Sequence, residues 1–139
     1  MIVREAMHSG VSWVAPDTRL SEIAKIMKDE DVGAVPVGEN DRLIGMVTDR
    51  DITCRGLTGG DDPRSLTARD VMSERITYCT ENEQVEDALR IMEQHKIRRL
   101  PVLNDEKRMV GMLSLGDVAQ SVPQSLCGEV LRAVSAHHP

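Results

Sequence analysis

Apolar side chains recur along the first half of the chain in two periods that follow one another. Within 20–27 they have the i, i+3, i+4, i+7 spacing of one helix face, and Asp17 or Thr18 is expected to cap that helix. An apolar run over 32–37, a polar turn and a second run over 43–47 then give the pattern of a β-hairpin. With a short strand before and a short helix after, the predicted order is strand, helix, strand, strand, helix.

The second half of the chain repeats this order. At an offset of 65 residues Met7 aligns with Met72, and the only two aromatic residues, Trp13 and Tyr78, align with each other. After one inserted residue the offset becomes 66, and further identities follow in the same order. Matches in order with a single shift indicate that the chain is a duplication of one unit.

The duplication predicts the domain organisation. The Gly- and Asp-rich stretch LTGGDDPRSLTA separates the copies. The expected boundaries are a first repeat at 1–57, a linker at 58–68, a second repeat at 69–122 and a helical tail at 123–139. One unit has too few helices to cover both faces of its sheet, so we expect an α/β (α+β) fold of two pseudo-symmetric β-α-β-β-α repeats packed sheet to sheet.

Composition and charge exclude several classes. A net charge of -6 and a pI near 5.2 argue against a broad nucleic-acid or membrane footprint. Three widely spaced cysteines indicate neither a disulfide framework nor a CxxC metal pair, and the four histidines lack metal-like spacing. No stretch approaches 18 apolar residues, and the first ten residues carry charge where a signal peptide needs an apolar core. We therefore expect a soluble cytoplasmic protein.

Two loops carry the candidate chemistry. GMVTDRD (45–51) and GMLSLGD (111–117) each place a hydroxyl, Thr48 or Ser114, three residues before a carboxylate, Asp51 or Asp117. Taken from the residues alone, these pairs either form capping boxes that open the following helix or present groups to a ligand, and both can hold at once. No nucleophile with a matching base, and no glycine-rich phosphate motif, points to an enzyme.

These features resemble a tandem pair of CBS domains, the regulatory unit called a Bateman module. The resemblance is carried by the two loops, by VGAVPV and IRRLPV, and by the matching segments that begin EAMHSG and DVMSER. It implies an adenosyl ligand (AMP, ADP, ATP, NAD or S-adenosylmethionine) in clefts between the repeats, with no metal required. It also implies a homodimer that signals to a protein partner in trans. The alternative is a structural dimerisation scaffold whose clefts are empty or vestigial.

The resemblance assigns roles to individual residues. Asp51 and Asp117 would accept hydrogen bonds from the ribose hydroxyls, and Thr48 and Ser114 would donate hydrogen bonds to phosphate. The backbone amides at the start of the next helix would favour binding of the anionic phosphate. The other candidate ligand contacts are Ser12, Trp13, Val32, Gly33, Pro36, Arg50, Thr77, Tyr78, Ile97, Arg98, Arg99, Pro101 and Gly116.

Two groups of these candidates have competing interpretations. Trp13 and Tyr78 either stack on adenine or fill a core or dimer contact. The arginines either reach phosphate or are solvated or ion-paired surface side chains. Arg50 faces Gly116 in the alignment, and Arg98-Arg99 face Gly33-Ala34. The two sites therefore differ in charge, which predicts unequal occupancy.

Overall fold

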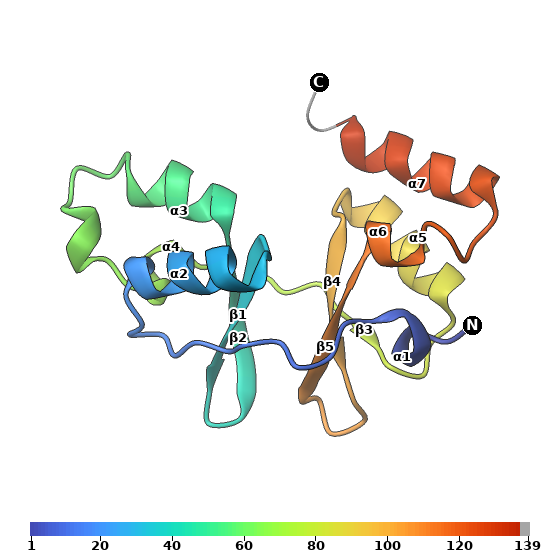
Figure 1. Cartoon of the computed structure of the whole chain (residues 1–139), viewed down its shortest axis with the longest axis horizontal. Coiled ribbons are helices and arrows are strands. Elements are labelled where there is room, and N and C mark those ends of the chain that lie inside the picture. Colours follow the sequence, from blue (N-terminus) through green and yellow to red (C-terminus); the bar gives the residue numbers. More distant parts are fainter. Residues whose placement is uncertain (137–139) are drawn as a thin grey trace. The chain divides into compact units, whose positions relative to one another are not determined.

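The computed structural model describes residues 1–136, and the histidines His137 and His138 lie outside the described residues. The chain separates into two compact units, one formed by Ser12–Ile76 and the other by Met1–Val11 together with the residues from Thr77 onward. Both mix helices with β-strands (Figure 1), which confirms the predicted fold class. None of the helices in the described part of the chain combines the length and the apolar character needed to cross a membrane.

The unit Ser12–Ile76 is built on one antiparallel hairpin. Its elements are α2 (Leu20–Glu30), β1 (Ala34–Glu39), β2 (Arg42–Thr48), α3 (Asp49–Gly56), η1 (Pro63–Ser65) and α4 (Ala68–Val71). The hairpin turns at Asn40 and Asp41, whose φ angles of 56° and 63° are those of a two-residue turn matched to the twist of the strands. The expected first strand is reduced to one parallel bridge between Val14 and Val37.

The start of α2 differs from the prediction. The residue before the helix is Arg19, which makes no side-chain cap bond. Thr18 instead accepts a hydrogen bond at its Oγ1 from the Ala15 amide at 3.0 Å, so it closes a turn outside the helix. The predicted capping role of Asp17 or Thr18 is therefore wrong, although Leu20 and Ile23 are buried as their helical spacing predicts.

The other unit contains a three-stranded sheet. Its elements are α1 (Val3–Ala6), β3 (Cys79–Thr80), α5 (Val85–His95), β4 (Arg99–Leu103), β5 (Met109–Ser114), α6 (Leu115–Val118) and α7 (Gln124–Ser135). In this sheet β3 runs parallel to β4, and β4 runs antiparallel to β5. The predicted tail helix is confirmed as α7, which packs on α5 through the buried Val130 and Val134.

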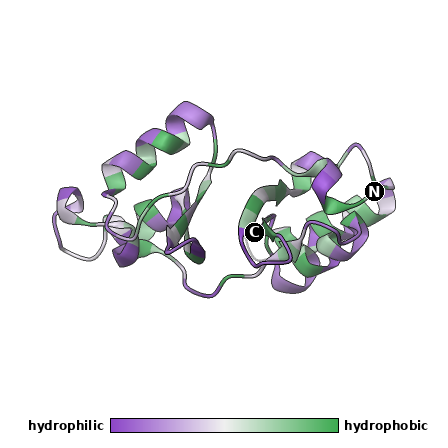
Figure 2. Cartoon of the chain, turned by 90° about the horizontal axis from the view of Figure 1, so that it is seen from below, coloured by the Kyte–Doolittle hydropathy of each residue, from purple (hydrophilic) through white to green (hydrophobic). Residues whose placement is uncertain are grey.

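Both cores consist almost entirely of aliphatic side chains. One is centred on Ile23, Val35 and Val47, and the other on Leu89, Met92 and Leu100, all of them fully buried. The helices accordingly alternate hydrophobic and hydrophilic residues along their turns (Figure 2).

The compact units do not coincide with the expected repeat boundaries. Val3 of α1 packs in the core of the second repeat, while Ala68 and Val71 of α4 pack in the core of the first. The segment after each short helix pairs with the last strand of the same unit, through a bridge between His8 and Met112 and one between Ser73 and Met46. Each repeat is therefore completed by a segment that precedes the other repeat in the sequence.

Candidate ligand-binding loops

The first loop forms where β2 ends and α3 begins. The Thr48 amide donates to Asp51 Oδ2 at 2.9 Å, and the Asp51 amide donates to Thr48 Oγ1 at 3.0 Å. This reciprocal pair is a capping box, so the structural interpretation of the motif is confirmed for this loop. It also fixes the Asp51 carboxylate against the backbone through only one of its two oxygens.

The second loop repeats this geometry between β5 and α6. The Ser114 amide donates to Asp117 Oδ2 at 2.9 Å, and the Asp117 amide donates to Ser114 Oγ at 3.2 Å. Both hydroxyl oxygens are thus engaged as acceptors, and what each hydroxyl can still offer a ligand is its proton.

The remaining oxygen of each carboxylate distinguishes the two loops. Asp51 Oδ1 has no hydrogen-bond or ion-pair partner within residues 1–136. Asp117 Oδ1 lies 2.6 Å from His8 Nε2, and the Asp117 side chain is only 12% exposed. Sequence reasoning missed His8 because it considered histidines only as metal ligands. The available signal was the alignment of His8 with Ser73 at the offset of 65.

Each loop also contains a glycine, Gly45 or Gly111, that lies close to the backbone of another segment. A Cβ on Gly111 would lie 2.5 Å from the carbonyl oxygen of His8, and one on Gly45 would lie 3.1 Å from that of Ser73. In each loop the neighbouring backbone is the segment that follows a short helix, α1 for Gly111 and α4 for Gly45.

The amides at the start of α3 are already bonded within the chain. The Asp49 amide donates to the Gly33 carbonyl at 3.0 Å, and the Arg50 amide donates to Asp49 Oδ1 at 2.9 Å. With the Asp51 amide bonded to Thr48, the first turn has no free donor for an anion, so the expected amide contribution is wrong for this loop. The Leu115 amide likewise donates to the Arg98 carbonyl at 2.9 Å.

The three candidate arginines are exposed. Arg50 lies in the first turn of α3, Arg98 precedes β4, and Arg99 begins that strand. Their guanidinium groups make no ion pair with a carboxylate in the described part of the chain, and Glu30 instead accepts a hydrogen bond from the Ser12 hydroxyl at 2.5 Å. The phosphate role of the arginines stays a prediction.

Trp13 packs on its own unit. Its side chain is 38% exposed, and a Cβ on Gly38 of β1 would lie 2.6 Å from Trp13 Cζ3, so the ring covers that glycine. Tyr78 is 42% exposed beside β3. Stacking of either ring on adenine stays a prediction.

The other predicted contacts range from exposed to buried. Val32 and Gly116 are exposed, whereas Gly33, Thr77 and Ile97 are half-buried. The two prolines, Pro36 and Pro101, are buried within β1 and β4. Because each proline is buried in its own unit, these two residues are the candidates least accessible to a ligand.

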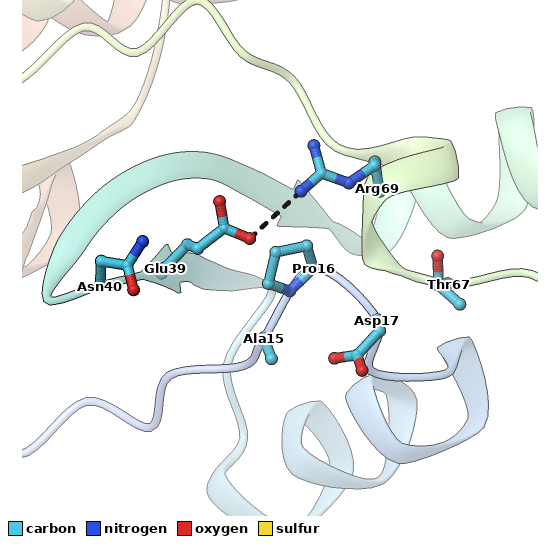
Figure 3. A pocket seen from close by; sticks show the side chains of 8 residues that line it. Ala15, Pro16, Asp17, Glu39, Asn40, Thr67 and Arg69 are labelled. Atoms are coloured by element: carbon cyan, nitrogen blue, oxygen red, sulfur yellow. Dashed lines mark hydrogen bonds and ion pairs between the residues drawn. The ribbon is translucent and has the colours of Figure 1, made fainter.

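A cavity of about 630 Å³ lies at the turn end of the β1–β2 hairpin (Figure 3). Thr48 lies at the opposite end of this hairpin, paired with Ala34. An ion pair between Arg69 and Glu39, at 3.4 Å, crosses the cavity. Its lining residues are Ala15, Pro16, Asp17, Gly38, Glu39, Asn40, Thr67 and Arg69. None of the predicted site residues is among them.

Comparison with known proteins identifies the family. The sequence pattern of the CBS domain matches residues 3–55 and 68–123. The chain belongs to the CBS domain family. A relative, Hypoxic response protein 1 of Mycobacterium tuberculosis, is 37% identical over 132 residues, which cover 94% of this chain and 92% of the relative.

Two solved CBS structures are similar to this chain. The crystal structure of Hypoxic Response Protein I with two coordinated zinc ions has a TM-score of 0.79 and 38% identity, and covers 88% of this chain and 100% of that one. The structure of CBSX2 in complex with AMP has a TM-score of 0.74 and 23% identity, over 86% and 94% of the two chains. At that identity the second shows a shared fold.

The zinc structure corrects the expectation of an adenine nucleotide with no metal, because a protein 38% identical to this chain holds two coordinated zinc ions. Zinc in proteins is usually held by three or four His, Cys, Asp or Glu ligands. Within residues 1–136, no three such side chains are placed to hold one ion, and His8 with Asp117 supplies only two.

Proposed function

We propose that this chain is a regulatory, non-catalytic module that binds an adenosyl ligand at one or both of its hydroxyl-x-x-carboxylate loops and signals to a protein partner in trans. Membership of the CBS family supports a regulatory role. The AMP complex of CBSX2 supports the ligand class through the shared fold. The ligand would be AMP, ADP, ATP, NAD or S-adenosylmethionine.

The observation that carries the proposal is the unshared oxygen of Asp51. The capping box holds this carboxylate through Oδ2, and Oδ1 has no partner among residues 1–136. Hydrogen bonds from ribose hydroxyls to an ionised carboxylate contribute about 1.5–3 kcal/mol each. A carboxylate already fixed by the fold does not have to be ordered when the ligand binds, which favours affinity.

Isothermal titration calorimetry with AMP, ATP, NAD and S-adenosylmethionine tests the proposal. Asp51→Asn keeps an oxygen that can accept from the Thr48 amide but removes the charge, so it should weaken binding about 10- to 100-fold, the loss of one charge-assisted bond. Asp49→Asn is the matched control, because it removes a charge from the same loop. The proposal is wrong if none of the four compounds binds, or if both variants weaken binding equally.

The alternative function is a structural scaffold, and one surface feature favours it. Leu131 of α7 is 51% exposed and Leu57 is 64% exposed, which leaves apolar surface on both units. A scaffold predicts that Asp51→Ala with Asp117→Ala leaves self-association unchanged while Leu131→Asp abolishes it. Sedimentation velocity of both variants tests the scaffold, and binding of AMP, ATP, NAD or S-adenosylmethionine in the calorimetry above separates it from the regulatory module. The homodimer, the protein partner and the cytoplasmic location stay predictions.

A further inference from the structure

The second loop has its outward carboxylate oxygen covered by a histidine, and the first loop does not. His8 Nε2 lies 2.6 Å from Asp117 Oδ1, so both oxygens of Asp117 are engaged, one by the Ser114 amide and one by the imidazole. In the first loop only Oδ2 of Asp51 is engaged.

The backbone places His8 and Ser73 in the same position relative to their loops. The His8 amide donates to the Met112 carbonyl at 2.8 Å and the Met112 amide donates back at 2.9 Å. Ser73 and Met46 exchange the same two bonds, at 2.9 and 3.1 Å. With the backbone matched, the difference between the loops comes from the side chain. The serine hydroxyl makes no bond with Asp51 in the structure.

From this asymmetry we propose that His8 decides which loop takes a ribose diol. The first loop is the diol site, and the second accepts a diol only when the ligand displaces the imidazole from Asp117. His8 can be displaced because its side chain is 74% exposed, whereas Asp117 is 12% exposed and remains fixed by its capping box. This inference rests on the proposed function, and it assigns the difference between the sites to a residue outside both loop motifs.

The expected effect is a difference in affinity between the loops. A diol entering the second loop must displace the imidazole from Asp117 Oδ1, which corresponds to about 10-fold weaker binding there. Replacing His8 by the serine found in the first copy should remove most of that difference. Placing a histidine at Ser73 should create it in the first loop.

The test is titration of AMP into four proteins: the unchanged chain, His8→Ser, Ser73→His and the double exchange. We expect one tight site in the unchanged chain, two sites of similar affinity in His8→Ser, a weakened tight site in Ser73→His, and one tight site again in the double exchange. Adding Asp51→Asn should remove the tight site of the unchanged chain, and adding Asp117→Asn should remove that of the double exchange. Circular dichroism melts check that each variant is folded.

The outcomes separate this inference from the proposed function. Two equal sites in the unchanged chain, or a His8→Ser protein whose binding is unaltered, would overturn the role of His8 while leaving ligand binding established. Failure of AMP, ATP, NAD and S-adenosylmethionine alike to bind any of the four proteins, including the variant with both loops open, would overturn both. As a ligand-free check, Asp117→Asn should shift the ring-nitrogen signals of His8 in NMR spectra, and unchanged signals would contradict the contact itself.

Discussion

Substitution of Gly111 by alanine should destabilise the unit that contains the second loop much more than the equivalent change at Gly45 destabilises the other. At Gly111 the added Cβ would lie 2.5 Å from the backbone carbonyl oxygen of His8, a distance that forces the two segments apart. At Gly45 the nearest atom, at 2.6 Å, is the flexible sulfur of Met72, and the backbone oxygen of Ser73 is 3.1 Å away. A side-chain tip can move aside, whereas a paired backbone cannot.

The expected loss of stability can be estimated from the contacts that the added Cβ disturbs. Separating the segments at Gly111 weakens the two bonds between His8 and Met112, each worth about 0.5–1.5 kcal/mol, and residual overpacking adds about 1–3 kcal/mol. The reduced freedom of the unfolded chain offsets about 0.4–1 kcal/mol. We expect a loss of about 2–4 kcal/mol for Gly111→Ala and about 1 kcal/mol for Gly45→Ala.

Urea unfolding followed by circular dichroism measures these losses, and hydrogen exchange of the His8 and Met112 amides locates them. Gly116→Ala is the control, since its Cβ would meet nothing closer than 3.8 Å. Equal stability of the Gly111→Ala and Gly45→Ala proteins would refute the argument. So would unchanged exchange of the Met112 amide in Gly111→Ala.

Three further changes test other parts of the structure. Gly38→Ala should push the Trp13 ring off β1 and shift its fluorescence emission to longer wavelength. Val130→Asp places a charge at a fully buried position, so it should release α7 and speed hydrogen exchange throughout Gln124–Ser135. Burial, with a smaller effect from Glu83, raises the pKa of Cys79 to about 12 from 9.0. The folded state therefore keeps a proton that the unfolded chain loses, stability should fall as pH rises above about 9, and Cys79→Ala should reduce that fall.

Each of these three predictions would be contradicted by a specific result. If the emission spectrum of Gly38→Ala is unchanged, like that of a Gly59→Ala control, then Trp13 does not cover Gly38. Exchange in α7 equal to that of Ser125→Asp, at an exposed position of the same helix, would mean that Val130 does not hold the helix in place. The same alkaline loss in Cys79→Ala and in the unchanged protein would assign it to other groups.

The repeated hairpin and helices were predictable because their signals are local. Helical spacing over 20–27 and the run-turn-run pattern that follows depend on neighbours in sequence, and the duplication supplies a second, independent reading of each. The capping boxes at Thr48 and Ser114 were foreseen as one of two interpretations for the same reason, since their partners are three residues away.

What the sequence did not reveal depends on partners far apart in the chain. The contact between His8 and Asp117 joins residues more than a hundred positions apart, and no spacing rule connects them. The cover of Trp13 over Gly38 needs a glycine on a strand that the ring reaches only after folding. The Asp49 amide at the start of α3 is occupied because the antiparallel pairing of β1 with β2 brings the Gly33 carbonyl, which precedes β1, beside it. Periodicity and motif spacing carry no information about such encounters.

The two halves of the chain depend on each other for folding. Met1–Val11 packs with the residues from Thr77 onward, and α4 packs in the core of the first repeat. This is the geometry of a segment exchange between two copies of one repeat, here within a single polypeptide. A chain cut within 58–66 would give two fragments, each lacking a segment that the other retains. Fragment complementation should therefore restore both units only when the two pieces are mixed.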